Sequence, residues 1–116
     1  MKRFNSIKKN EEFRYIYNNG KSYANKNLVM YVIRTENNKN RIGISVSKKV
    51  GNSVVRHHLT RLIRESFRLN EEKFQYNVDI VVVVRVQAKD AEYKEILSSF
   101  LHLCRLHRLL LKEEMV

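Results

Sequence analysis

A valine-rich segment, Val78 to Val86, restricts the folds open to this chain more than any other feature of its sequence. β-branched residues favour strands, and a strand without alternating polar residues is typical of one buried on both faces or in the middle of a sheet. The longest uninterrupted apolar stretch within it, Ile80 to Val84, is far too short to cross a bilayer. The segment therefore predicts a buried strand inside a sheet.

Two earlier segments also have the character of strands. Residues 28–34 are rich in β-branched and aromatic side chains, and Ile42, Ile44 and Val46 alternate with small or polar residues in segment 41–47. The polar residues 36–40 between them predict a turn, so we expect a hairpin with one buried face and one open face of small polar groups. A further short strand is possible over residues 21–24.

Three helices are expected around these strands. Asn10 has the residue type of an N-cap for a short helix that ends at Asn18-Asn19-Gly20. A second helix begins at Gly51-Asn52 and runs to about Arg68, with an apolar face of Val55, Leu59, Leu62 and Ile63. Asp90 is the expected cap of a last helix, whose buried stripe is Tyr93, Ile96, Leu97, Phe100, Leu101 and Cys104.

These elements follow one another in the order αβββαβα, which predicts an α+β sandwich of one mixed four-stranded sheet packed with helices. The chain has no proline, and its three glycines are scattered at positions 20, 43 and 51, so we see no linker or repeat. We therefore expect residues 1–116 to form a single domain.

The charge balance points to a polyanionic partner. The chain carries 23 Lys and Arg against 12 Asp and Glu, a net charge of +11, which a compact domain tolerates best when a polyanion neutralises it. Nucleic acid is the leading candidate, because a membrane-binding protein would usually be a single amphipathic helix without strands. The single cysteine, Cys104, and the lack of a signal-peptide pattern predict a cytoplasmic protein.

The second helix concentrates this charge. Residues 47–68 contain six Lys or Arg and one acid, Glu65. Helical spacing places His57, Arg61, Arg64 and Arg68 on the side opposite Leu59 and Leu62. The alternative is an ordinary solvated helix face, but such faces usually mix charges of both signs. Lys48 and Lys49 extend the positive surface into the preceding loop, which favours a phosphate backbone as the ligand.

Aromatic residues beside positive charge suggest a second nucleic-acid surface. Phe13, Tyr17 and Tyr31 near Lys48 match the stacking platforms that hold single strands. Ser45 and Ser47 keep the open face of the sheet low enough to admit a strand. The alternative is that these aromatic residues belong to the core, and the sequence alone does not decide which way Tyr31 faces.

Other chemistry has little support in the sequence. Cys104, His107 and nearby His102 are too few for a zinc site, and Cys104 lies in an apolar stripe. Asp79 has no recognisable carboxylate partner for two-metal nuclease chemistry. We predict neither a catalytic residue nor a metal ligand in this chain.

The basic helix and the strands around it resemble those of a known family. Residues 48–68, KKVGNSVVRHHLTRLIRESFR, look like the signature helix of bacterial ribonuclease P proteins, and residues 41–47 and 79–85 are similar to the third and last strands of that family. With Phe13, Tyr17 and Gly20, the resemblance spans nearly the whole chain. The family usually has Arg-Asn-Arg where this chain has Arg56-His57-His58, and Lys where it has Thr60.

The resemblance implies a protein that assists a catalytic RNA in removing the 5′ leader of precursor tRNA. It assigns contacts with that RNA to one set of residues: Lys49, Asn52, Arg56, His57, His58, Arg61, Arg64 and Arg68. The leader would lie against another set: Phe13, Tyr17, Tyr31, Ser45, Ser47 and Lys48. Mg²⁺ would be held mainly by the RNA and the substrate, with none bound tightly by the protein and no obligate protein partner.

The resemblance also implies an unusual left-handed crossover through the basic helix, whereas general rules favour the right-handed form. Two other functions remain open from the residues alone. A ribosomal or other structural RNA-binding protein would share the charge and the basic helix, and a small metal-dependent nuclease would need clustered acids.

Overall fold

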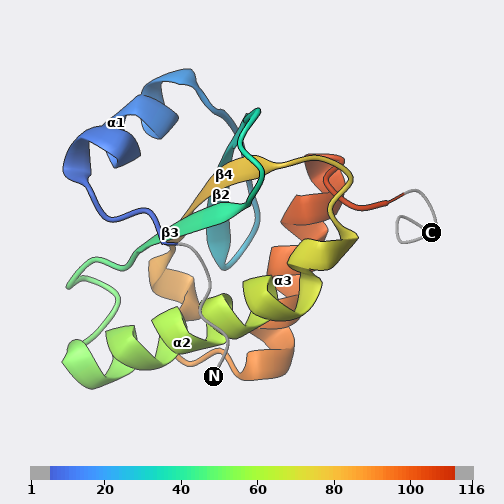
Figure 1. The fold of residues 1–116 in the computed structure, drawn as a ribbon. Coiled ribbons are helices and arrows are strands. Elements are labelled where there is room, and N and C mark those ends of the chain that lie inside the picture. Colours follow the sequence, from blue (N-terminus) through green and yellow to red (C-terminus); the bar gives the residue numbers. More distant parts are fainter. Residues whose placement is uncertain (1–5, 112–116) are drawn as a thin grey trace.

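The computed structural model describes residues 6–111 and contains one four-stranded sheet with three α-helices (Figure 1). In chain order the elements are α1 (Asn10–Asn19), β1 (Lys21–Ala24), β2 (Leu28–Arg34), β3 (Arg41–Ser45), α2 (Ser53–Asn70), β4 (Val78–Val84) and α3 (Tyr93–Leu106). Short 3₁₀ turns cover Glu71–Lys73 and Val86–Ala88. This order confirms the predicted fold class and the short strand at residues 21–24.

β4 occupies an inner position in the sheet, whose strand order is β1-β2-β4-β3. It pairs antiparallel with β2, where Tyr31 lies opposite Val81, and parallel with β3, where Gly43 lies opposite the same Val81. Its residues are buried on both faces, except that Val83 is half-buried. The valine run thus has the central place predicted for it, but the strand ends at Val84, and Val86 is exposed in the 3₁₀ turn that follows.

The expected hairpin of residues 28–34 with residues 41–47 is wrong. β4 lies between β2 and β3, and the antiparallel neighbours joined by a short turn are β1 and β2. Both faces of β4 are buried, so water cannot easily reach its backbone. An inner position in the sheet gives its N–H and C=O groups hydrogen-bond partners along both edges. The connection after β2 therefore carries the chain past the end of β4 to the far edge of the sheet.

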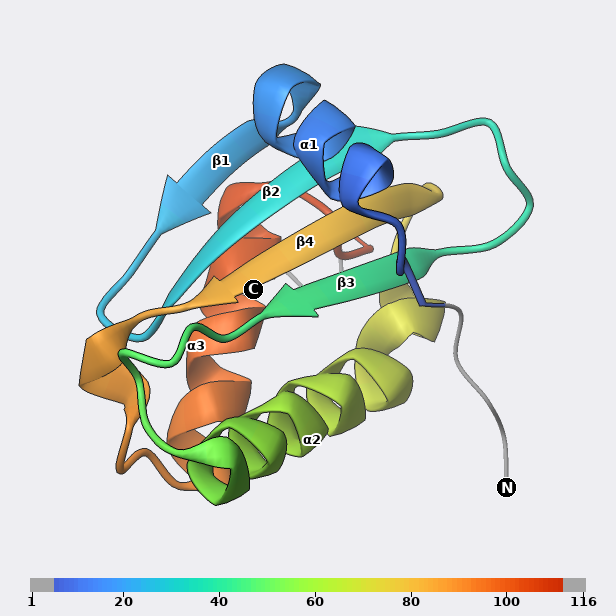
Figure 2. The same cartoon turned by 90° about the vertical axis from the view of Figure 1, so that its left-hand side faces the viewer.

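Helices cover both faces of the sheet (Figure 2). On one face, Ile16 of α1 packs with Ile7 and Val81 in a small cluster. On the other, α2 and α3 bury a larger core against alternate residues of β4, including Ile80 and Val82. The two faces of the sheet therefore differ: a thick core lies beneath α2 and α3, and a single short helix lies across the opposite side.

α2 begins one residue after its cap. The Asn52 side chain accepts a hydrogen bond from the Val55 backbone N–H at 3.0 Å, which satisfies a donor that the helix itself leaves unpaired. Leu59, Ile63 and Phe67 are fully buried and anchor the helix. Because α2 lies on the α3 side and links parallel neighbours β3 and β4, the crossover is left-handed (Figure 2).

Two predicted helix caps are wrong. Asn10 lies inside α1, whose N-cap is Lys9 with no side-chain hydrogen bond. The cap of α3 is Glu92, not Asp90, because Glu92 and Glu95 form a reciprocal capping box. The predicted stripe of α3 is partly right: Ile96, Phe100 and Cys104 are buried, whereas Tyr93, Leu97 and Leu101 are only half-buried. Leu103 completes the buried set. None of the described helices is both long and apolar enough to cross a membrane.

Candidate nucleic-acid interface

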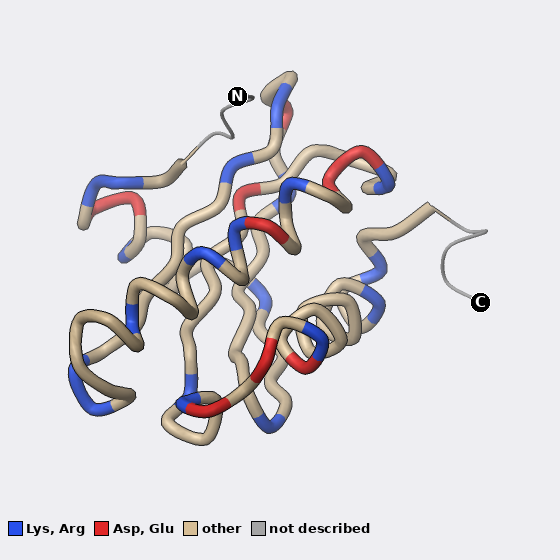
Figure 3. Tube along the Cα trace, turned by 90° about the horizontal axis from the view of Figure 1, so that it is seen from below, with Lys and Arg blue, Asp and Glu red and all other residues tan. Residues whose placement is uncertain are grey.

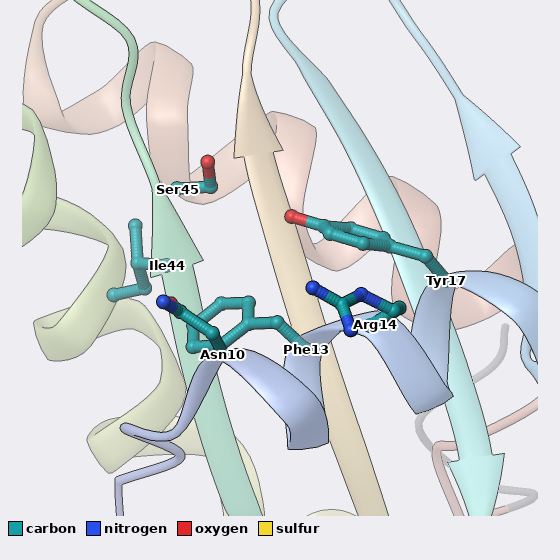
Figure 4. A pocket seen from close by; sticks show the side chains of 6 residues that line it. All are labelled: Asn10, Phe13, Arg14, Tyr17, Ile44 and Ser45. Atoms are coloured by element: carbon teal, nitrogen blue, oxygen red, sulfur yellow. The ribbon is translucent and has the colours of Figure 1, made fainter.

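A groove of about 400 Å³ runs between α1 and the sheet (Figure 4). Its lining comes from one side of α1 and from the end of β3: Asn10, Phe13, Arg14, Tyr17, Ile44 and Ser45. It is open to solvent and combines two aromatic rings with a guanidinium group. Phe13, Tyr17 and Ser45 are thus brought together as the sequence predicted.

Tyr31 joins this groove through Tyr17. The two rings meet edge to face with their centroids 4.9 Å apart, and the Tyr17 ring lies 6.3 Å from that of Phe13. Tyr31 therefore lies on the α1 face of β2, which answers the question of orientation that the sequence left open. Tyr17 retains 36% of its surface exposed, so the end of this aromatic row is available for stacking.

Gly43 allows α1 to approach the sheet closely. A Cβ atom at this position would stand 2.6 Å from Cζ of Phe13 and 3.1 Å from Cβ of Ile7. Any larger side chain would push the Phe13 ring away from β3. The floor of the groove is therefore shallow because a glycine and a serine, Ser45, occupy the strand beneath it.

Four further residues bear on this prediction: two predicted residues lie outside the groove, and two that were not predicted as site residues line it. Ser47 and Lys48 lie beyond the end of β3 in an exposed loop and do not line the groove. The sequence reasoning missed Arg14, and also Asn10, which it took for a cap. The signal was present, because Asn10, Arg14 and Tyr17 follow one another at helical spacing on one side of α1.

An ion-pair network holds α1 over the sheet. Arg41 of β3 donates to both carboxylate oxygens of Asp79, at 3.0 and 2.7 Å, and to Glu12 of α1 at 2.8 Å. The hydrogen bond from Arg41 lowers the pKa of the Glu12 carboxyl, and its two carboxylate partners raise the pKa of Arg41. Asp79, which the sequence left without a role, is therefore the buried partner of this clamp.

The basic stripe on α2 faces outward. His57, His58, Arg61, Arg64 and Arg68 are exposed. Figure 3 shows how basic positions recur along the helix and continue into the loop before it. Near the start of the helix, a shallow hollow of about 490 Å³ is lined by Ser53, Val54, His57, His58 and Arg61. Phosphate groups of a nucleic acid would meet several donors along one side of the domain.

The remaining predicted RNA contacts differ in their availability. Lys49 is exposed, whereas Arg56 is half-buried and its Nε is covered. The Asn52 side-chain oxygen is used by the cap of α2. Arg68 forms a surface ion pair with Glu65, whose pKa is lowered chiefly by that hydrogen bond. This pair lies in water at the outer side of the helix, so it does not turn the stripe inward.

Cys104 and His102 of α3, and His107 just after it, are either buried or already in contact with other residues. Cys104 is fully buried, and burial raises the pKa of its thiol. The His107 ring lies 2.9 Å from the Met30 carbonyl, which accepts a hydrogen bond from Nε2. His102 contacts Asn25 instead. Among residues 6–111, no three His, Cys, Asp or Glu side chains come together in an arrangement that would hold a metal ion.

Comparison with known proteins agrees on one family. The family model described as Ribonuclease P matches residues 1–108. The ribonuclease P protein component of Lachnoclostridium phytofermentans is 53% identical over 94% of this chain and 94% of its own. That of Alkaliphilus metalliredigens is 50% identical over 91% of this chain and 96% of its own.

Solved structures give the same answer. The RNase P protein of Staphylococcus aureus, 37% identical, superposes with a TM-score of 0.86 and covers 94% of this chain and 100% of its own. That of Thermotoga maritima, 27% identical, gives a TM-score of 0.77 and covers 84% of this chain and 93% of its own. Sequence, fold and the arrangement of the basic helix beside the sheet therefore lead to one conclusion: this chain belongs to the ribonuclease P protein family.

Proposed function

We propose that this protein is the subunit of ribonuclease P that binds both the catalytic RNA and the 5′ leader of precursor tRNA. The proposal depends on one observation: this small domain has two separate surfaces with the chemistry to bind RNA, a groove lined by aromatic residues and a stripe of exposed basic residues. The aromatic groove lies between α1 and one face of the sheet, and the basic stripe lies on α2 beyond the other face. The protein therefore joins a single strand to a large folded RNA. This role would place the protein in the cytoplasm.

The groove suits a single-stranded leader. An unpaired nucleotide exposes a base that stacks on aromatic rings and a phosphate that pairs with a cation. Tyr17 and Phe13 supply the rings, and Arg14 supplies a cation on the same wall. Lys48 and Ser47 extend this polar path beyond the end of β3.

The stripe on α2 suits the RNA subunit. Arg61 and Arg64, with Lys49 in the loop before the helix, face solvent along one side. His57 and His58 add imidazole rings that hydrogen-bond or stack on RNA. Such a surface gains affinity by releasing counterions from several phosphates, so binding weakens as salt rises.

The chemistry of cleavage is assigned to the RNA. Mg²⁺ held mainly by the RNA subunit and the substrate would supply the hydrolytic step. Two acidic groups between α1 and the sheet, Glu12 and Asp79, are both paired with Arg41. Neither carboxylate is left to hold a metal ion tightly, which supports a protein that positions RNA and does not cut it.

Reconstitution tests the proposal directly. We expect the purified protein to stimulate leader removal by a bacterial ribonuclease P RNA at low Mg²⁺, and to leave precursor tRNA intact when no RNA subunit is present. Cleavage by the protein alone would favour a metal-dependent nuclease. Binding without stimulation would favour a structural RNA-binding protein of another assembly.

Replacing Tyr17 by alanine should weaken binding of leader-bearing precursor tRNA by about tenfold, because one stacked base contributes roughly 1–3 kcal/mol. Leaderless tRNA should bind the reconstituted enzyme as before. Tyr15→Ala is the matched control, since Tyr15 is on the same helix, is 61% exposed and does not line the groove. Affinities from equilibrium titration that fall equally for both substrates would contradict the leader groove.

A further inference from the structure

A second groove, of about 510 Å³, lies between the β1–β2 turn and α3. It does not share any lining residue with the aromatic groove. All the residues that line it have polar or charged side chains, and most of these are basic or carry a hydroxyl group: Asn25, Lys26, Asn27, Lys94, Glu95, Ser98, Ser99 and His102. Neither the aromatic groove nor the α2 stripe uses these residues.

The β1–β2 turn is fixed rigidly to α3. The Asn25 side-chain oxygen accepts from the backbone N–H groups of Asn27 and Leu28 at 3.2 and 3.0 Å. Its amide nitrogen donates to the Ser99 carbonyl at 3.0 Å, and Asn27 Nδ2 bonds to Ser99 Oγ at 2.9 Å. The turn therefore stands in one orientation and holds Lys26, its exposed tip, at the mouth of the groove.

His102 is oriented by the same turn. Asn25 Nδ2 lies 3.1 Å from His102 Nδ1. An amide nitrogen only donates, so Nδ1 accepts, and the proton of the neutral ring is on Nε2. His102 thus retains an N–H donor that the contact with Asn25 does not use.

The cations of this groove are not neutralised within the described part of the chain. Lys26 and Lys94 are exposed, and neither forms an ion pair with a residue among 6–111. The only carboxylate in the lining, Glu95, accepts from the Glu92 backbone N–H at 3.3 Å in the capping box of α3. Arg85 Nη1 donates to the Asn25 carbonyl at 3.0 Å and brings another positive charge to the turn.

We propose that this groove binds the phosphate backbone of the RNA subunit, with Lys26, Lys94, Ser98 and the Nε2–H of His102 as the donors along it. Ammonium, hydroxyl and imidazole N–H donors on a rigid frame are the groups that contact phosphodiesters. The inference rests on the proposed function. The RNA subunit is the occupant because α3 packs beside α2, on the face of the sheet opposite the leader groove.

The test replaces Lys26 and Lys94 together by alanine in the full chain. Binding to a bacterial ribonuclease P RNA should weaken about tenfold, and the plot of log affinity against log salt should become shallower by about one to two. The matched control is Arg34→Ala with Lys39→Ala, which removes the same charge at the opposite end of β2. Circular dichroism should show the wild-type fold in both double variants.

Three results would separate the possibilities. Affinity and salt dependence equal to those of the Arg34/Lys39 control would overturn the phosphate site. A loss confined to precursor tRNA would also overturn it and would assign the groove to the substrate. If the wild-type protein itself fails to bind the RNA subunit, the proposed function fails first, and that outcome is visible before any variant is compared.

Discussion

Alanine at both Arg61 and Arg64 should weaken binding to a bacterial ribonuclease P RNA by about 10- to 100-fold, since each phosphate contact contributes on the order of 1 kcal/mol. Both side chains are exposed on the outer side of α2, whereas Leu59 and Ile63 on the inner side hold the helix in the core. The substitutions therefore remove charge and leave the buried face of α2 unchanged. Fluorescence or filter-binding titrations across a range of salt concentrations measure the loss.

The salt dependence distinguishes lost phosphate contacts from a general loss of charge. Neutralising fewer phosphates releases fewer counterions, so the slope should become shallower by about one to two. Arg34→Ala with Lys39→Ala again serves as the control, because it lowers the net charge equally at a site away from α2. Equal weakening by the two double variants would mean that the α2 stripe has no specific part in RNA binding.

Replacing Arg41 by methionine should destabilise the fold by about 3 kcal/mol, because removing one partner leaves a buried charge unpaired. The side chain of Asp79 is only 11% exposed, and Arg41 is its bidentate partner. For a domain of this size we expect a fall in melting temperature of about 10 °C or more. Thermal unfolding followed by circular dichroism measures it.

A second substitution isolates the cause of that loss. In Arg41→Met with Asp79→Val, the unpaired carboxylate is gone and β4 gains another valine, so most of the stability should return. A double variant as unstable as the single one would mean that the contacts of the arginine stem, and not the buried charge, carry the effect. Leader binding should fall in both variants, because Glu12 of α1 then loses its link to the sheet.

The same network gives a dependence on pH. The folded-state pKa of Glu12 is lowered by its hydrogen bond with Arg41, so the unfolded chain binds more protons in the acidic range. The contribution of this pair is present above the ordinary glutamate pKa and is lost as pH falls through the lowered one. In Arg41→Met this part of the acid dependence should disappear.

Much of this architecture follows from local pattern. The valine run has the pattern of a strand that is buried on both faces or lies in the middle of a sheet, and β4 is that strand. The spacing of Leu59 and Ile63 against Arg61 and Arg64 fixed which side of α2 is buried and which meets water. These predictions succeed because burial and helical periodicity are properties of neighbouring residues.

Strand partners and the finer parts of the site depended on the tertiary structure. No local pattern in residues 28–34 indicates that β2 pairs with β4 and not with residues 41–47. Arg14 lines the groove only because α1 packs on Gly43, and Asp79 is paired with Arg41, which is far away in the chain. The groove at Lys26 likewise joins a turn to a helix that begins at Tyr93. Sequence periodicity specifies which face of each element is apolar. Which faces and edges meet is decided by the free energy of packing the whole chain, to which residues far apart in the sequence contribute as much as neighbours do.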